Sequence, residues 1–242
     1  MRIAVLSDIH ANYHALEATL AAVDAEGVDQ LWCLGDTVGY GPRPNRCCAL
    51  VRDRAVLCLA GNHDLAVTGA LSVEEFNGDA AAAVRWTRRA LEPDSREFLD
   101  SLEPVATRPG VELYHGSPLD PVWDYVLDES SAYLSFRSTQ APLLLVGHTH
   151  VPLALSWDGR DLAGGLAAEL AEVDLAQSRW LLNPGSVGQP RGGDPRASWL
   201  LIDDQARRAT FRRVRYPIEQ TQAELRERGL PEPLAERLAH GV

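Results

Sequence analysis

The sequence predicts an α/β fold. The prediction is based on the pattern of apolar residues, which differs between the two parts of the chain. In the first part, short apolar runs alternate with stretches whose apolar residues recur at helical spacing, the pattern of β-α-β units. From Val151 onwards the chain changes to short strand-like runs separated by turns. Several apolar runs end directly in Asp, Asn or His, so polar side chains are expected at the ends of strands.

Three strands and two helices are predicted in the N-terminal part. The strands cover residues 3–6, 30–34 and 56–60, and the helices cover residues 13–26 and 45–53. Leu16, Leu20 and Val23 recur at the spacing of one helix face, which indicates the first helix. Glycine and proline interrupt regular structure, so residues 38–44 are expected to form a loop.

The remainder of the chain adds a helical insertion, further strands and a terminal helical segment. Residues 65–103 are alanine-rich and interrupted at Pro93, which predicts a mostly helical cap between two strands. Strands are expected at residues 111–114, 143–146, 153–157, 171–175, 179–182, 199–202 and 210–215, and one or two helices at residues 218–239. No linker or repeat divides the sequence, so residues 1–242 are predicted to form one domain.

Composition and charge narrow the classes of partner. A hydrophobic fraction of 45% and a charged fraction of 24% are ordinary for a soluble globular chain of 242 residues. The net charge of −11 gives no general attraction to nucleic acid or to anionic membranes. Neither is therefore expected as a partner, and a nuclease is disfavoured. No apolar run approaches the roughly 18 residues of a membrane span.

The cysteines and the first residues predict a cytoplasmic location. Cys33, Cys47, Cys48 and Cys58 include no CxxC pair, so reduced thiols are favoured over disulfides or a zinc site. The apolar run after Met1 is too short for a signal peptide.

Five short segments place metal-binding side chains at the ends of apolar runs, and they hold five of the seven histidines. The segments are Asp8-Ile9-His10, Gly35-Asp36, Gly61-Asn62-His63-Asp64, His115-Gly116 and Gly147-His148-Thr149-His150. Because the strand ends of an open α/β sheet meet at one crevice, these distant positions are expected to become neighbours. Their side chains suffice for two cations that share one carboxylate, a centre suited to the hydrolysis of phosphate esters.

Each segment alone is compatible with a plainer interpretation. Gly-Asp is a common turn, Asn-His-Asp can cap a helix, and a single histidine at a strand end is more often structural than a ligand. Two histidines at i and i+2 after an apolar run, as in His148 and His150, rarely serve packing. The joint occurrence of all five segments favours the metal centre.

Together the segments resemble those of the calcineurin-like metallophosphoesterases. The loops Gly39–Pro42, His115–Pro118 and Asn183–Arg191 are similar to loops of the small prokaryotic phosphodiesterase branch of that family. The resemblance implies two mixed β-sheets sandwiched between helices, with the metals at the edge of the sheets. It also implies hydrolysis of a small phosphodiester or phosphomonoester through a hydroxide that bridges two metals.

The resemblance further implies a set of metal ligands. Asp8, His10 and His150 would hold the first metal, Asn62, His115 and His148 would hold the second, and Asp36 would bridge the two. Carboxylate, amide and imidazole ligands without thiolates suit Mn²⁺, Fe²⁺ or Zn²⁺, and Mn²⁺ is the first candidate of the three.

His63 is left over from this ligand set. In the family the corresponding histidine points at the phosphate and protonates the departing alkoxide, which predicts a general acid here. Asp64 is predicted either to orient His63 or to cap the helix that follows.

The chain departs from the Ser/Thr protein phosphatases of the family at one place. Gly39 and Tyr40 stand where those enzymes carry an Asp that orients the catalytic His and an Arg that grips phosphate. Arg191 is the candidate substitute for that arginine, with a solvated loop residue as the alternative. Asn12 and Tyr40 are candidate substrate-binding residues. Further pocket candidates, for which core packing is the alternative, are Tyr13, Asn77, Trp86, Trp123 and Tyr125.

Two other functions remain in competition with a general phosphoesterase. Some relatives in this branch resemble diadenosine tetraphosphate hydrolases. Other members of the superfamily keep the fold but have lost catalytic residues and act as protein-binding scaffolds. The complete ligand set together with His63 argues against a scaffold, since a degraded site would be expected to lack one of these residues.

Overall fold

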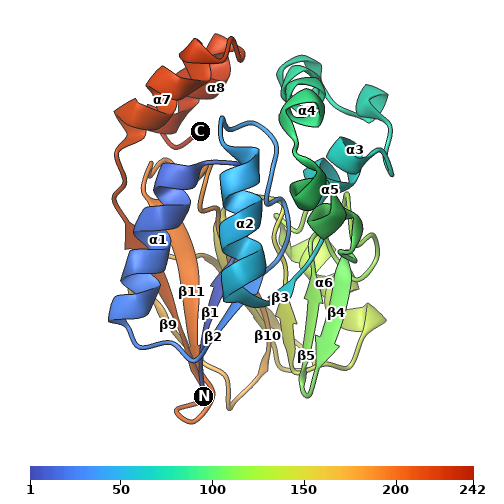
Figure 1. Cartoon of the computed structure of the whole chain (residues 1–242). Helices are drawn as coiled ribbons and strands as arrows, with labels where there is room; N and C mark the ends of the chain where they lie inside the picture. Colours follow the sequence, from blue (N-terminus) through green and yellow to red (C-terminus); the bar gives the residue numbers. More distant parts are fainter.

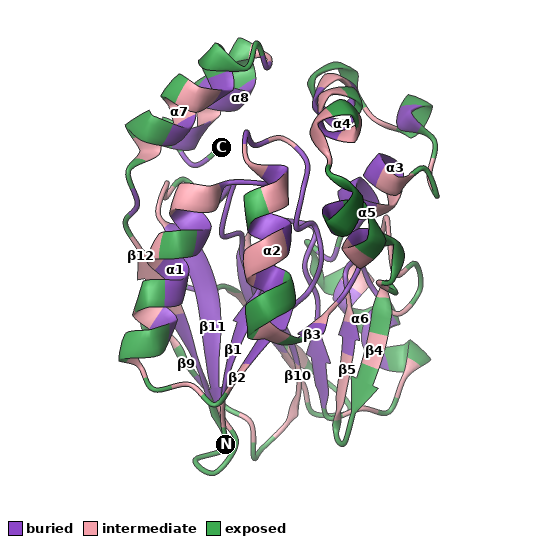
Figure 2. Cartoon of the chain, in the orientation of Figure 1, coloured by how far each residue is buried: buried purple, intermediate pink, exposed green.

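The computed structural model describes residues 1–242 and confirms an α/β fold of two mixed β-sheets, each of six strands, between layers of helices (Figure 1). Apolar side chains from the inner faces of both sheets form the central core, among them Val5, Leu34, Leu145 and Phe211. Figure 2 shows buried residues along the strands and on the helix faces that lie against them. The polar residues at the strand ends therefore extend from a rigid, apolar base.

The first sheet has the strand order β3-β2-β1-β11-β12-β9. Its strands are β1 (Arg2–Leu6), β2 (Gln30–Cys33), β3 (Ala55–Cys58), β9 (Glu172–Asp174), β11 (Ala197–Asp203) and β12 (Arg208–Val214). β1, β2 and β3 are parallel, and β11 is antiparallel to β1. The three parallel strands thus end on the same side of the molecule.

The second sheet has the strand order β4-β5-β6-β10-β7-β8. Its strands are β4 (Val105–Arg108), β5 (Val111–Tyr114), β6 (Leu143–Leu145), β7 (Pro152–Trp157), β8 (Leu162–Leu166) and β10 (Arg179–Pro184). β5, β6 and β10 are parallel, and the other pairs are antiparallel.

Helices cover the outer face of each sheet. α1 (Tyr13–Ala25) and α2 (Pro44–Arg54) cover the first sheet, and α6 (Glu129–Ser138) covers the second. The side chain of Asn12 caps α1 by accepting a hydrogen bond from the backbone N–H of Ala15. Nowhere in the chain does a helix combine the length and the hydropathy needed to cross a membrane.

Two helical segments stand at the end of the sandwich where the parallel strands finish (Figure 1). The segment predicted as a cap holds α3 (Asn62–Thr68), the 3₁₀ turn η1 (Val73–Glu75), α4 (Gly78–Ala90) and α5 (Pro93–Asp100). The C-terminal segment holds α7 (Ile218–Glu227), α8 (Glu232–Glu236) and η2 (Arg237–Ala239). The two segments share an apolar cluster in which Ala83 of α4 packs with Leu225, Leu234 and Leu238, and Trp86 lies against it.

Three elements of the structure were not predicted from the sequence. β4 lies at a sheet edge and is mostly exposed, so it lacks the apolar alternation of a half-buried strand. β8 contains Gly164 and Gly165, which are poor strand formers. α6 is rich in serine, which favours caps and turns over helix interiors.

Candidate metal centre and active-site cavity

The side chains of the five metal-binding segments gather at one end of the sandwich. The segments follow the carboxyl ends of β1, β2, β3, β5 and β6. Their Asp, Asn and His side chains are all buried. Groups of three with ligand atoms within 4.8 Å of one another are Asp8, His10 and His150, then Asp36, His115 and His148, and also His10, Asp36 and His63. The structure thus brings together residues that are up to 142 positions apart in the chain.

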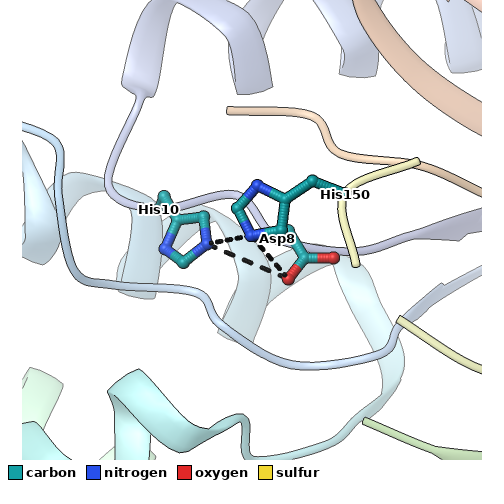
Figure 3. Close-up of side chains that lie close together, drawn as sticks. All are labelled: Asp8, His10 and His150. Atoms are coloured by element: carbon teal, nitrogen blue, oxygen red, sulfur yellow. Dashed lines mark hydrogen bonds and ion pairs between the residues drawn. The ribbon is translucent and has the colours of Figure 1, made fainter. Parts of the chain in front are cut away.

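The first group converges closely (Figure 3). Nε2 of His150 lies 3.4 Å from Oδ1 of Asp8 and 3.0 Å from Nε2 of His10. Nε2 of His10 lies 3.9 Å from the same Asp8 oxygen. Three potential ligand atoms therefore face a common point.

Asp36 lies between this group and the second one. Its Oδ2 is 3.5 Å from Nε2 of His10 and 3.6 Å from Nε2 of His115. Nε2 of His115 is also 3.2 Å from Oδ1 of Asn62. One carboxylate oxygen is thus within reach of both groups, the arrangement that a bridging ligand requires.

Backbone carbonyls determine which nitrogen each histidine presents. Nδ1 of His10 donates to the carbonyl oxygen of Val38 (3.1 Å), and Nδ1 of His115 donates to that of Leu34 (2.8 Å). Nδ1 of His150 donates to the carbonyl oxygen of Gln189 (2.6 Å). Since a carbonyl only accepts, each Nδ1 carries the proton, and in the neutral ring each Nε2 presents a lone pair to the centre.

The burial of these rings keeps them neutral. Burial lowers the pKa of His10 and of His150 well below the usual value, and it lowers the pKa of His115 to about 4. The Nε2 atoms of His10 and His150, 3.0 Å apart, therefore both carry lone pairs and repel each other. A cation between them removes this repulsion, and the donor set fits one.

In both Asp8 and Asp36, one carboxylate oxygen accepts a backbone hydrogen bond and the other faces the histidines. Oδ2 of Asp8 accepts from the backbone N–H of His148 (3.2 Å), and Oδ1 of Asp36 accepts from that of His63 (2.9 Å). Oδ1 of Asp8 and Nε2 of His148 are buried without any hydrogen-bond partner. Burial raises the pKa of Asp8 to about 7 and that of Asp36 well above its usual range. Divalent cations would satisfy the orphaned atoms and favour the charged carboxylates.

The backbone at the centre is strained. Asp8, His10, Asp36, His148 and His150 all adopt positive φ values between 49° and 64°. Such left-handed conformations cost non-glycine residues on the order of 1–3 kcal/mol each and cluster at functional sites. Five predicted ligands are thus held in a conformation that the surrounding packing must impose.

His63 lies in the first turn of α3, beside the metal-binding groups. Its ring centroid is 4.9 Å from that of His10, 4.4 Å from that of Tyr40 and 4.9 Å from that of Phe76. Its Nδ1 is buried without a partner and lies against Gly39, where a Cβ atom would come within 2.3 Å of it. Burial lowers the pKa of His63 to about 3. No carboxylate orients this ring.

The side chain of Asp64 forms hydrogen bonds with backbone N–H groups. Its carboxylate accepts hydrogen bonds from the N–H groups of Thr37 (3.2 Å), Val38 (3.0 Å) and Gly61 (3.1 Å). These bonds cap α3 and join the segment after β2 to the segment after β3. Of the two predicted roles, the hydrogen bonds of Asp64 support the cap, and none of them reaches His63.

A cavity of about 280 Å³ opens onto the centre. Its lining includes Asp36, Asn62, His63, His148 and His150, together with Tyr40, Glu75, Phe76, Asn77, Ala80, Trp123, Tyr125 and Arg191. Two predicted substrate-binding residues, Tyr40 and Arg191, therefore lie at this cavity. Nη2 of Arg191 donates to Oε1 of Gln189 (3.0 Å), which leaves most of its donors free.

The structure does not bring Asn12 to this cavity. The side-chain amide of Asn12 donates to the carbonyl oxygen of Gly188 (2.9 Å) and accepts from Thr221 (3.0 Å) as well as from Ala15. The hydrogen bonds of Asn12 join α1, α7 and the loop after β10. Asn12 therefore has a structural role in the fold.

Aromatic residues form one side of the cavity. The ring of Tyr125 stacks on that of His148, with a centroid distance of 4.1 Å and an interplanar angle of 18°. The rings of Trp123 and Phe76 lie 5.2 Å apart. The pocket candidates Asn77, Trp123 and Tyr125 line the cavity, whereas Phe76 and Glu75 of the cap were not predicted from the sequence.

The chain is similar to known proteins over most of its length. The family model described as the calcineurin-like phosphoesterase superfamily domain matches residues 1–206. An uncharacterized protein of Methanocaldococcus jannaschii is 37% identical over 245 residues, which cover 99% of this chain and 98% of that protein.

Two solved structures are similar over the whole chain. A metallophosphoesterase from Sphaerobacter thermophilus is 45% identical with a TM-score of 0.91, and the match covers 100% of this chain and 99% of that one. A hypothetical protein from Pyrococcus horikoshii is 21% identical with a TM-score of 0.82, over 100% of this chain and 98% of that one, and its likeness is one of fold. The chain therefore belongs to the calcineurin-like phosphoesterase superfamily.

Proposed function

We propose that the protein hydrolyses small phosphate esters with the help of two divalent cations. The observation that carries this proposal is the pair of neutral imidazoles whose Nε2 lone pairs face each other at 3.0 Å, beside the carboxylate of Asp36. A positive charge between the ligand atoms would remove the repulsion of the two lone pairs. Membership of a phosphoesterase superfamily supports the same reaction class.

The side chains divide into two ligand sets. Asp8, His10 and His150 hold one cation, Asn62, His115 and His148 hold the other, and Asp36 belongs to both sets. When bound, the cations supply a nucleophile at neutral pH by acidifying water, and they offset the negative charge of the phosphate. Mn²⁺ is the first candidate, with Fe²⁺ and Zn²⁺ as alternatives for this set of oxygen and nitrogen donors.

His63 is assigned as the general acid. Its ring borders both the metal-binding groups and the cavity, so it lies where a leaving group would depart. Burial keeps the ring neutral, and the negative charge of a bound phosphate raises the pKa of His63 toward the range in which it can give a proton.

Arg191 is assigned to the phosphate. It is the only lysine or arginine in the lining of the cavity, and its free guanidinium donors can grip a phosphate in a bidentate manner. Tyr40 borders the same space. Arg191 thus takes the place of the arginine that Gly39-Tyr40 does not supply.

The cavity favours a small ester as the substrate. Its volume of about 280 Å³ lies just below the range for ligand pockets, roughly 300–1,000 Å³. An extended substrate such as a dinucleoside tetraphosphate would protrude from it.

We also place the protein in the cytoplasm, because its four cysteines are free thiols.

The first prediction concerns metal dependence. Metal-stripped protein reloaded with Mn²⁺ is expected to hydrolyse bis(p-nitrophenyl) phosphate or p-nitrophenyl phosphate, and the preferred ester separates a diesterase from a monoesterase. Asp36→Asn is expected to abolish turnover because it weakens the shared ligand. Asp53→Asn, at an exposed carboxylate on α2, is the matched control and should retain full activity. A fully active Asp36→Asn protein would rule out Asp36 as the shared ligand, whereas bound metal without turnover of any ester would favour the scaffold function.

The second prediction separates the role of His63 from that of the ligands. His63→Ala is expected to retain both cations and to lose about 10²–10⁴-fold in turnover of an alkyl phosphate ester, whose leaving group needs a proton. Turnover of the corresponding p-nitrophenyl ester should fall much less, since that phenolate departs unprotonated. His240→Ala, at an exposed histidine, is the control. Equal losses on the two esters would rule out general-acid catalysis by His63.

The third prediction concerns Arg191. Arg191→Gln is expected to raise KM by about tenfold to a hundredfold, because a charged hydrogen-bonded contact to phosphate is lost. Arg191→Lys should recover part of the loss. Metal content, measured by atomic emission, should not change in either variant, and Arg160→Gln at an exposed arginine should behave as the parent. An unchanged KM in Arg191→Gln would mean that Arg191 is a solvated loop residue, which is the alternative interpretation.

A further inference from the structure

A second, larger cavity lies at the opposite end of the sandwich. It has a volume of about 650 Å³ and shares no lining residue with the active-site cavity. Its walls include Ile3, Gln30, Val56, Val111 and Leu143, which lie at the amino ends of β1, β2, β3, β5 and β6. The metal-binding segments follow the carboxyl ends of the same five strands. The two cavities are therefore separated by the length of the sheets.

The walls of this second cavity are mainly apolar. Trp32, Leu143 and Ile202 are buried and belong to the core between the sheets, so the cavity is an open end of that core. Nε1 of Trp32 donates to the side chain of Gln30 (3.1 Å), so the indole presents its apolar face without an unpaired donor. Val56 at the mouth is 61% exposed. Concave apolar openings of this volume are typical of sites for small ligands.

Two arginines are among the polar side chains that line the cavity. Arg108 is the last residue of β4, directly before the turn to β5, and Arg207 lies in the turn between β11 and β12. Their guanidinium groups donate to the carbonyl oxygens of Thr107 (3.0 Å) and Leu175 (3.3 Å), which leaves most of their N–H donors free. Asp204 is the one acidic residue of the lining. This local excess of positive charge stands out in a chain of net charge −11.

We propose that this cavity binds a small amphipathic carboxylate of the medium-chain fatty-acid class. The hydrocarbon chain lies between the amino ends of the two sheets, where it covers the exposed apolar side chains of Val56 and Met1. The carboxylate lies at the mouth, where Arg108 and Arg207 supply charged donors. A nucleotide fits less well, because the polar atoms of its base would lie unpaired against apolar walls.

The test measures displacement of a fluorescent amphipathic anion from the full-length protein. 1-Anilinonaphthalene-8-sulfonate is the reporter, decanoate is the competitor, and decylamine is the same chain with the opposite charge. Decanoate is expected to displace the reporter well below its micelle concentration, and decylamine is not. The double variant Arg108→Gln/Arg207→Gln should weaken decanoate binding by about fivefold or more. A control pair of exposed arginines, Arg89→Gln/Arg160→Gln, should not.

Two further measurements keep the result interpretable. Val56→Glu places a carboxylate at the mouth on an exposed position and should also weaken decanoate binding, with an unchanged circular dichroism spectrum. Hydrolysis of the p-nitrophenyl esters by these variants reports separately on the metal centre at the other end. Failure of decanoate to displace the reporter, displacement by decylamine to the same degree, or equal decanoate affinity in the double variant would each overturn the proposal.

Discussion

The structure depends on one electrostatic constraint, the burial of imidazole lone pairs and carboxylate oxygens that face one another. The backbone carbonyls of Leu34, Val38 and Gln189 hold the Nδ1 protons of three histidines, so the Nε2 atoms have no proton to share. Without cations, such a cluster would consist of acceptors facing acceptors, which costs several kcal/mol in a buried site. With cations, the same atoms become a ligand set formed before the metals bind. The free energy of metal binding is then also stabilisation of the fold.

Much of the surrounding architecture serves to hold this cluster together. Asp64 joins the segments after β2 and β3 through three backbone N–H groups, and the loop after β10 joins two more segments. In that loop the side chain of Ser186 donates to the carbonyl oxygen of Asp8 (2.7 Å), and near the end of β10 the side chain of Asn183 donates to the carbonyl oxygen of Gly147 (2.7 Å). Gly61 is required because a Cβ atom there would lie 2.0 Å from Oδ1 of Asp36. The positive φ values of the ligands are maintained by these contacts.

The sequence was sufficient to predict the fold class and the gathering of the metal-binding segments, because each segment follows an apolar strand and carries its chemistry in its side chains. The orientation of the histidines was not predictable, since the carbonyls that fix it leave no trace in residue type. Asn12 shows the converse case. It was predicted to bind the substrate, but its amide joins α1, α7 and the loop after β10. Phe76 reaches the cavity only through the packing of the cap, which no local pattern reveals.

The central claim is that two cations lie on either side of one carboxylate, and anomalous X-ray diffraction from crystals soaked in Mn²⁺ tests it most directly. The account predicts two anomalous peaks about 3.5–4 Å apart with Asp36 between them. One peak should lie among Asp8, His10 and His150, and the other should lie among Asn62, His115 and His148. A single peak, or two peaks without Asp36 as a shared ligand, would contradict it.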